Sequence, residues 1–166
     1  MVKPREWTPA YVGLGSNLDE PLQQIAAALA AIARLPDTRV ECRSRLFRNP
    51  PFGVTDQPDF VNGVAGVLTG LPPIELLRCL KRIEQSQGRD PAGPRWGPRT
   101  IDLDLLMHGA WRIDSPDLGL PHPGIARRNF VLFPLLEIAP TLEVPGVGSL
   151  SSLAAALDAG GLVAVG

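Results

Sequence analysis

The feature that most constrains the fold is a strict alternation of side chains along residues 100–105, which read Thr-Ile-Asp-Leu-Asp-Leu. Side chains of a β-strand point alternately to its two faces, so the isoleucine and both leucines share one face while Asp102 and Asp104 share the other. The apolar face has to pack against other elements. The segment therefore predicts a half-buried strand with an acidic outer face.

The two aspartates suggest a metal site, although a simpler reading remains open. Their backbone positions lie about 7 Å apart at about 3.3 Å per residue, so both carboxylates can reach one metal or a pair separated by about 4 Å. Hard oxygen ligands favour magnesium or manganese over zinc. On the aspartates alone, a solvated strand face neutralised by Arg95 and Arg99 is an equally good interpretation, because structural ion-pair networks are common.

The turn before this strand favours a catalytic role. Gly97 and Pro98 form a sharp bend between two arginines whose guanidinium groups are suited to bidentate phosphate contacts. Trp96 supplies an indole that can stack on a ring. Cations beside metal-binding carboxylates are what an enzyme needs to hold a magnesium-bound polyphosphate.

The order of hydrophobic patterns predicts the fold class. Apolar or alternating runs predict strands at 10–14, 39–46, 60–68 and 100–105, and helical spacing predicts helices within 19–36 and 72–88. The order strand, helix, strand, strand, helix, strand is that of an α+β, ferredoxin-like βαββαβ core with a mainly antiparallel sheet. We expect the helices on one face, the other face left for ligand, and short C-terminal additions after Met107.

Composition and charge limit the possible functions. With 166 residues, of which 45% are hydrophobic, residues 1–166 should form a single domain with its own core. The net charge of −1 gives no general attraction for nucleic acid or acidic membranes. Met1 to Pro9 contain no apolar signal segment, and Cys42 and Cys79 stand alone, like small core hydrophobes. We expect a cytoplasmic monomer.

Several other residues are candidates for ligand binding. Phe60 and Asn62 lie on one face of a predicted strand, and a half-buried amide needs a partner, which a ligand can supply. The long loop from Asn49 to Pro58 is either a binding loop or a plain surface connection. His122 stands between two prolines, where a fixed imidazole can donate to phosphate.

The Gly13-Leu-Gly15 sequence does not continue as a dinucleotide-binding GxGxxG motif, because Leu18 stands where the third glycine belongs. We interpret these two glycines as positions of close backbone packing.

Seven short motifs stand in an order that resembles one enzyme family over nearly the whole chain. They are GLGSN from Gly13, NPPFG from Asn49, DFVNG from Asp59, RIEQSQGR from Arg82, RWGPRTIDLD from Arg95, LPHP from Leu120 and RRNFVL from Arg127. Together they resemble the 6-hydroxymethyl-7,8-dihydropterin pyrophosphokinases of folate biosynthesis, and RWGPRTIDLD is highly specific to that family.

The resemblance implies an ATP-dependent transferase. Such enzymes move the β,γ-pyrophosphoryl group of ATP to the pterin hydroxymethyl group with two magnesium ions, and they release AMP. Asp102 and Asp104 would be the metal ligands, with Arg89 and Arg99 completing the catalytic set. The implied ATP-binding residues are Glu84, Arg95, Trp96, Arg99, Leu105, His122 and Arg128. The implied pterin-binding residues are Asn49, Pro51 and Phe52, chiefly through backbone groups, with Asn62 at the ring edge and Phe60 and Phe130 stacking on the ring.

Two other functions remain as alternatives. One is an ordinary ATP-dependent kinase that uses the same metal and arginine chemistry but releases ADP. The other is a non-catalytic ferredoxin-like module that stacks single-stranded RNA on Phe60, Trp96 and Phe130. The net charge and the paired aspartates argue against the RNA module.

Overall fold

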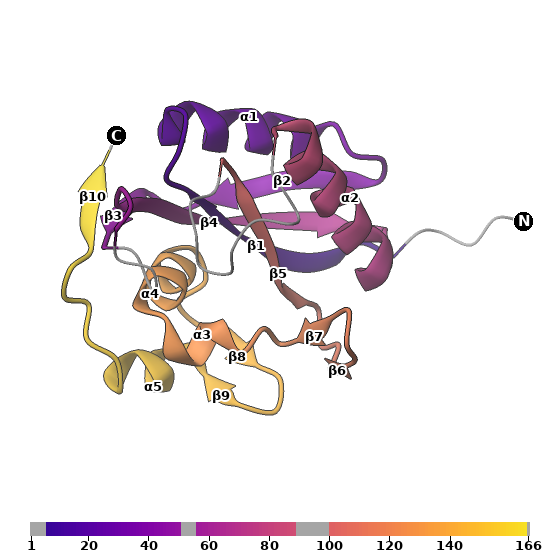
Figure 1. Cartoon of the computed structure of the whole chain (residues 1–166). Helices are drawn as coiled ribbons and strands as arrows, with labels where there is room; N and C mark the ends of the chain where they lie inside the picture. The colour runs from indigo at the N-terminus through magenta and orange to yellow at the C-terminus, as the bar shows by residue number, and fades with distance from the viewer. Residues whose placement is uncertain (1–5, 51–55, 89–99, 166) are drawn as a thin grey trace, which may run out of the picture.

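The computed structural model describes residues 6–50, 56–88 and 100–165 of the chain (Figure 1). Its core elements are β1 (Thr8–Ser16), α1 (Pro21–Ala33), β2 (Thr38–Arg43), β3 (Leu46–Asn49), β4 (Phe60–Thr69), α2 (Pro73–Ser86) and β5 (Asp102–His108). The elements that follow are β6 (Ile113–Asp114), β7 (Gly119–Leu120), α3 (Gly124–Arg127), α4 (Asn129–Ile138), β8 (Glu143–Val144), β9 (Gly148–Ser149), α5 (Leu150–Ala155) and β10 (Val163–Val165).

The main sheet confirms the predicted α+β, mainly antiparallel architecture. Its strand order is β10-β3-β4-β1-β5, and β2 pairs with β4 beyond the end of β3. Each of these pairings is antiparallel. β1 lies between β4 and β5, so it holds together two strands that are distant in the sequence. Two small hairpins, β6-β7 and β8-β9, complete the described strands.

Helices α1 and α2 cover one face of this sheet, as the helical spacing predicts (Figure 1). A proline in the first turn starts each helix, where its missing N–H costs nothing. α1 buries Ile25, Leu29 and Ile32, and α2 buries Leu76 and Leu80. These side chains form one hydrophobic cluster with the inward residues of β1, β4 and β5. This packing fixes which face of β5 is apolar.

The segment 39–46, which the alternation predicts as one strand, is divided into β2 and β3. A register shift between Val40 and Cys42 inserts one extra residue into β2 relative to β4. Between β2 and β3, the Glu137 carboxylate accepts hydrogen bonds from the backbone N–H of Arg45 at 2.8 Å and from its Nε at 3.1 Å. The extra residue moves Cys42 off the core face. Cys42 is therefore exposed and its prediction as a core residue is wrong, whereas Cys79 is buried as predicted.

The C-terminal additions have a larger structural role than the sequence indicates. α4 packs against the sheet face opposite α1 and α2, where its Leu132 and Leu135 join a second cluster with Val64 of β4 and Leu106 of β5. This face is therefore only partly left for ligand. β10 pairs with the outer edge of β3. No helix in the described ranges is long and apolar enough to cross a membrane.

Thiol labelling tests the packing of the two cysteines. We expect Cys42 to react quickly with an aromatic disulfide reagent in the native protein and Cys79 to react only after unfolding, because α2 buries it. Mass spectrometry of the labelled peptides measures both, and Cys42→Ser is the control that removes the fast reaction. Fast labelling of Cys79 in the folded Cys42→Ser variant would contradict the packing of α2.

Candidate active site

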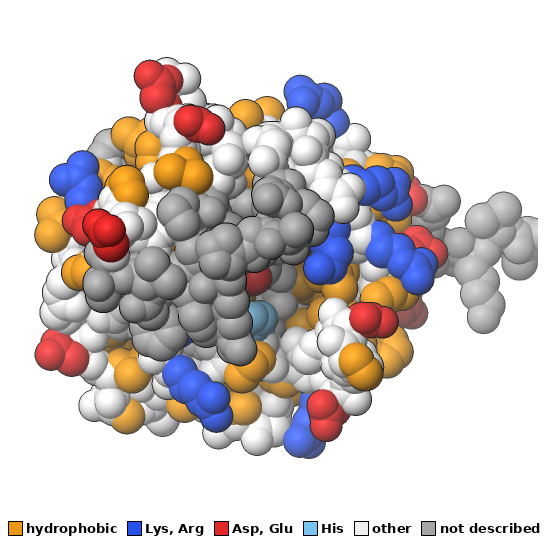
Figure 2. Space-filling view, viewed as in Figure 1, with side chains coloured by type: hydrophobic (Ala, Val, Ile, Leu, Met, Phe, Trp, Pro, Cys, Tyr) orange, Lys and Arg blue, Asp and Glu red, His pale blue; other side chains and the backbone are white. Residues whose placement is uncertain are grey.

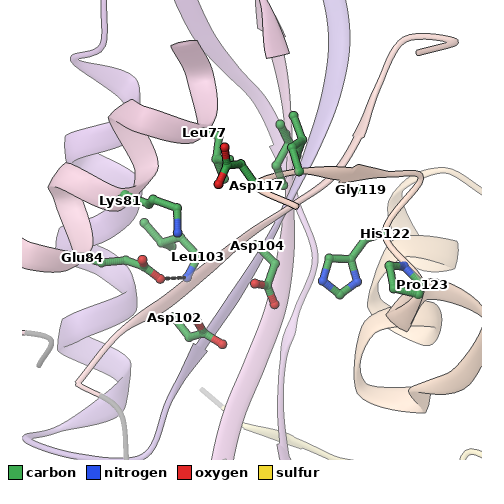
Figure 3. Close-up of a pocket in the computed structure, with 12 residues that line it drawn as sticks. Leu77, Lys81, Glu84, Asp102, Leu103, Asp104, Asp117, Gly119, His122 and Pro123 are labelled. Atoms are coloured by element: carbon green, nitrogen blue, oxygen red, sulfur yellow. Dashed lines mark hydrogen bonds between the residues drawn. The ribbon is translucent and has the colours of Figure 1, made fainter. Parts of the chain in front are cut away.

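The two aspartates lie on the free face of β5, as the alternation predicts. Asp102 and Asp104 are half-buried, while Leu103 and Leu105 between and beyond them are buried in the core. Their carboxylates point to the same side of the strand (Figure 3). On β1 they face Gly15 and Gly13, which have no side chains to fill the space beside them. Neither glycine adds a side chain to the sheet face that the acidic pair shares.

A pocket of about 340 Å³ lies along the outer edge of β5, next to the aspartates. α2 forms one wall with Leu77, Lys81 and Glu84, and the segment around β7 forms the other with Asp117, Gly119 and His122. This volume lies within the range of small-molecule sites, which is about 300–1,000 Å³. Figure 2 shows a hollow in which a histidine and an acidic side chain are visible, with Lys and Arg side chains gathered beside it over α2.

Glu84 connects the helix wall to the strand. Its side chain is buried, and Oε2 accepts a hydrogen bond of 2.8 Å from the backbone N–H of Leu103 (Figure 3). Strand N–H groups two residues apart point the same way, so the N–H of Leu105 is directed toward the same edge. The Leu105 side chain belongs to the core, so this residue offers the pocket its backbone. The backbone of an edge strand and a carboxylate beside it can together hydrogen-bond to the polar edge of a planar ring.

His122 is held in place by two hydrogen bonds. Its backbone N–H donates to the Leu106 carbonyl at 2.9 Å, which fastens the loop to β5. Its Nδ1 accepts from the Gly124 N–H at 2.9 Å, so in the neutral ring the proton is on Nε2, which is then available as a donor. Burial lowers the pKa of His122 below its ordinary value, and Arg128 lowers it further, while Asp102 opposes the shift.

The donor set fits magnesium better than a transition metal. Within the described ranges, no group of three or more His, Cys, Asp or Glu side chains could hold a metal by itself. Two carboxylates on one strand face suit a hard cation that takes its other oxygens from phosphates and water. Asp102 and Asp104 are therefore the residues that could hold magnesium together with a nucleotide.

A second group of candidates lies across β1 from the aspartates. Gly15 pairs with Asp102 on one side and with Asn62 of β4 on the other, so these three residues form one row across the sheet. Asn62 Oδ1 lies only 2.7 Å from the place where a Cβ on Gly15 would be. The prediction of close packing is confirmed for Gly15, whereas a Cβ on Gly13 would meet only ordinary contacts, the nearest with Leu106 Cδ2 at 3.5 Å. Strands β4 and β5 are about 10 Å apart, at about 4.8 Å per strand.

The remaining candidates divide into three groups. Asn49 lies opposite Phe60 at the end of the β3-β4 pairing, next to Asn62. Phe130 and Arg128 lie at the start of α4, where Phe130 is partly packed against the second hydrophobic cluster. Outside the described residues are Pro51, Phe52, Arg89, Arg95, Trp96 and Arg99.

Sequence reasoning missed two features of this site. Leu77, Lys81 and Glu84 follow one another at intervals of four and three residues, so they line one stripe of α2 and all face the pocket. Extending the stripe from Glu84 back along the helix would have found Lys81. The side chain of Asn49 accepts a hydrogen bond from Asn62, whereas chiefly backbone contacts were expected from it. That contact depends on strand register, which the sequence pattern does not specify.

Two carboxylates beside a ligand-sized pocket are typical of enzymes that transfer groups from magnesium-bound nucleotides. Residues 11–140 match the family described as 7,8-dihydro-6-hydroxymethylpterin-pyrophosphokinase (HPPK). The chain belongs to this family.

Relatives named 2-amino-4-hydroxy-6-hydroxymethyldihydropteridine pyrophosphokinase support the assignment. The one from Pseudomonas aeruginosa is 51% identical over 146 residues, covering 88% of this chain and 90% of the relative. The one from Haemophilus influenzae is 44% identical over 144 residues, covering 87% and 89%. The structure of Plasmodium falciparum HPPK-DHPS with pterin and p-hydroxybenzoate shares the fold, with a TM-score of 0.71 at 14% identity. It matches 92% of this chain, which spans 43% of that longer protein.

The environment of His122 predicts a pH dependence. We expect His122 to titrate below the ordinary value of 6.5 in the ligand-free protein, because burial and Arg128 disfavour the imidazolium. As the pH falls, His122 is therefore protonated in the unfolded chain before it is protonated in the folded one, and protonation favours unfolding. The stabilising contribution of neutral His122 is complete above pH 6.5 and is lost as the pH falls toward the pKa of the folded state.

Proton NMR of the two histidines measures this pKa, and urea unfolding at several pH values measures the stability. His122→Gln should flatten that part of the pH dependence. A His122 pKa at or above 6.5 would show that the ring is not buried in this way.

Proposed function

We propose that this chain transfers the β,γ-pyrophosphoryl group of ATP to the hydroxymethyl group of 6-hydroxymethyl-7,8-dihydropterin, as a step of folate biosynthesis. The observation that carries the proposal is the row Asn62, Gly15, Asp102 across three neighbouring strands. It brings together an amide, a glycine that adds no side chain, and a carboxylate, in that order, which suits a ring edge at Asn62 and a metal at Asp102. The pocket beyond Asp102 would take the nucleotide.

The arrangement supports transfer between two bound substrates. We infer that the adenine lies along the outer edge of β5, between α2 and the β7 segment, near Glu84 and the Leu105 backbone. Its phosphates would then extend over Asp102 and Asp104 toward β1. A pterin ring over Gly15, read by Asn62 and stacked by Phe60 and Phe130, would present its hydroxymethyl group to them. Holding both reactants in line removes much of the entropic cost of a two-substrate reaction.

Charge stabilisation is the second contribution of the chain's own residues. Magnesium held by Asp102 and Asp104 would neutralise the phosphates and polarise the bond that breaks. His122 would donate from Nε2 to a phosphate oxygen, since its Nδ1 is already engaged by Gly124. Arg128 would add positive charge, and the proposed roles of Arg89, Arg95, Trp96 and Arg99 at the phosphates fall outside the described residues.

We further propose two magnesium ions, a monomer, a cytoplasmic location and a single catalytic domain over residues 1–166. Magnesium and ATP are supported by the family assignment and by the carboxylate pair. The pyrophosphokinase domains of some relatives are parts of larger proteins, such as the folate synthesis bifunctional protein of Arabidopsis thaliana, of which the match covers 27%.

The products of the reaction test the proposal. The protein is incubated with ATP, magnesium and 6-hydroxymethyl-7,8-dihydropterin, and the nucleotides are separated. Formation of AMP and a pterin diphosphate in equal amounts supports it. Formation of ADP would indicate an ordinary kinase, and no turnover combined with salt-sensitive RNA binding would indicate the RNA module.

The metal ligands give the next prediction. Asp102→Asn and Asp104→Asn should each lower turnover by about a hundredfold or more, the scale for losing one electrostatic contact in a transition state. The melting temperature should stay the same or rise, because each change keeps the volume and relieves repulsion between like charges. Steady-state kinetics at saturating magnesium and a thermal melt measure both. Near-normal turnover in both variants would remove these residues from the metal site.

Gly15 gives a second prediction with a matched control. Gly15→Ala should weaken pterin binding at least about tenfold, or about 1.4 kcal/mol, because its methyl group must displace Asn62 Oδ1 from 2.7 Å. Gly13→Ala adds the same group two residues earlier, where the nearest atom is Leu106 Cδ2 at 3.5 Å, an ordinary contact. Calorimetric titration with the pterin compares the two variants. Equal affinities for Gly15→Ala and the unaltered protein would mean that the ring does not lie here.

A further inference from the structure

The carboxamides of Asn49 and Asn62 form a buried pair where β3 meets β4. Asn49 is 5% exposed and Asn62 8% exposed. The antiparallel register places Asn49 opposite Phe60, so Asn49 and Asn62 are diagonal neighbours on one sheet face. Asn62 Nδ2 donates a hydrogen bond to Asn49 Oδ1. Because both side chains are buried, losing this contact would leave polar groups without partners.

The direction of this hydrogen bond is set by Asn49. Asn49 Nδ2 donates to the Pro50 carbonyl oxygen at 3.1 Å. A carboxamide has its donor at one end and its acceptor at the other, so Asn49 is left with its oxygen toward Asn62. An oxygen can only accept, and Asn62 must therefore turn its nitrogen toward Asn49. The oxygen of Asn62 then points the opposite way.

The Asn62 oxygen therefore points toward the candidate site. Asn62 Oδ1 lies over Gly15, next to the position that a Cβ would occupy, and Asp102 is the following residue in the row. Asn62 therefore presents an acceptor above β1, between Phe60 and the carboxylates. A ligand edge bound at this point has to bring an N–H or O–H group.

We propose that Asn49 is a positioning residue that selects the hydrogen-bonding edge of the substrate, by keeping the acceptor oxygen of Asn62 toward the site. The inference rests on the proposed function, which places the pterin over Gly15. The pterin ring presents two adjacent donors, the N3–H and the 2-amino group. An analogue with oxygen in place of the 2-amino group keeps the N3–H but replaces the second donor of this edge with an acceptor, which is unfavourable beside Asn62 Oδ1 because neither oxygen supplies a proton.

Two substitutions separate orientation from packing. Asn49→Leu has a similar volume and lacks both the acceptor and the donor, so Asn62 becomes free to turn its nitrogen toward the ligand. Asn49→Asp keeps an oxygen acceptor for Asn62 and replaces the donor to Pro50 with a second carboxyl oxygen, which is charged when the carboxyl is ionised. If Asn49→Leu does not fold, Asn49→Ala makes the same comparison. Thermal melts and ATP titration establish that each variant is folded and that its nucleotide pocket is intact.

The measurement is the ratio of affinities for 6-hydroxymethylpterin and 6-hydroxymethyl-lumazine, its 2-oxo analogue, by calorimetry. We expect the unaltered protein to prefer the pterin by about tenfold or more, the scale of one buried hydrogen bond that is made or left unmade. Asn49→Leu should lose most of this preference while ATP affinity is unchanged, and Asn49→Asp should keep it. A purely structural role would weaken both ligands equally and leave the ratio unchanged, and that result would overturn the inference.

Failure of the proposed function gives a different result. If the unaltered protein binds no pterin and forms no AMP, the function itself is wrong. If it binds pterin and turns over, but Asn62→Ala binds pterin as tightly, then Asn62 does not contact the ring. In that case the role of Asn49 is refuted and the function stands.

Discussion

The pairing of β1 with β4 and β5 is the constraint on which the rest of the structure depends. These two strands are separated by residues 70–101, which include α2, and β1 holds both in antiparallel register along most of its length. The register aligns Asn62, Gly15 and Asp102 in one row. A shift of one residue in either pairing would turn Asn62 or the aspartates toward the core. Stability and site geometry are therefore determined by the same backbone hydrogen bonds.

The two faces of the sheet are packed by different helices. α1 and α2 cover one face completely enough to bury Val12, Leu14, Leu103 and Leu105, and this packing fixes the orientation of β5. On the other face, α4 packs against Val64 and Leu106. The start of α4 carries Arg128 and Phe130, two residues of the proposed site. A C-terminal helix that the sequence pattern treats as an addition would therefore contribute to that site.

Local patterns predicted the fold and part of the site, and long-range register accounts for what they missed. The alternation along residues 100–105 identified the aspartate face because it depends only on the period of a strand. The same reasoning failed at Cys42, because one extra residue after Val40 reverses the alternation and only pairing with β4 reveals it. Lys81 was missed although helical spacing from Glu84 pointed to it. The contact between Asn49 and Asn62 joins two strands, so no single segment contained the signal.

The position of β5 at the edge of the sheet explains why the pocket is there. An edge strand exposes backbone N–H and C=O groups, which in most proteins must be shielded from pairing with other chains. Here the Glu84 carboxylate accepts a hydrogen bond from the Leu103 N–H, and the His122 N–H donates one to the Leu106 carbonyl. Between these two contacts, Leu105 lines the pocket. A planar ring with its own donors and acceptors can pair with that edge as a neighbouring strand would, and under the proposed function the carboxylates on the adjoining face would then lie near the phosphates of the nucleotide.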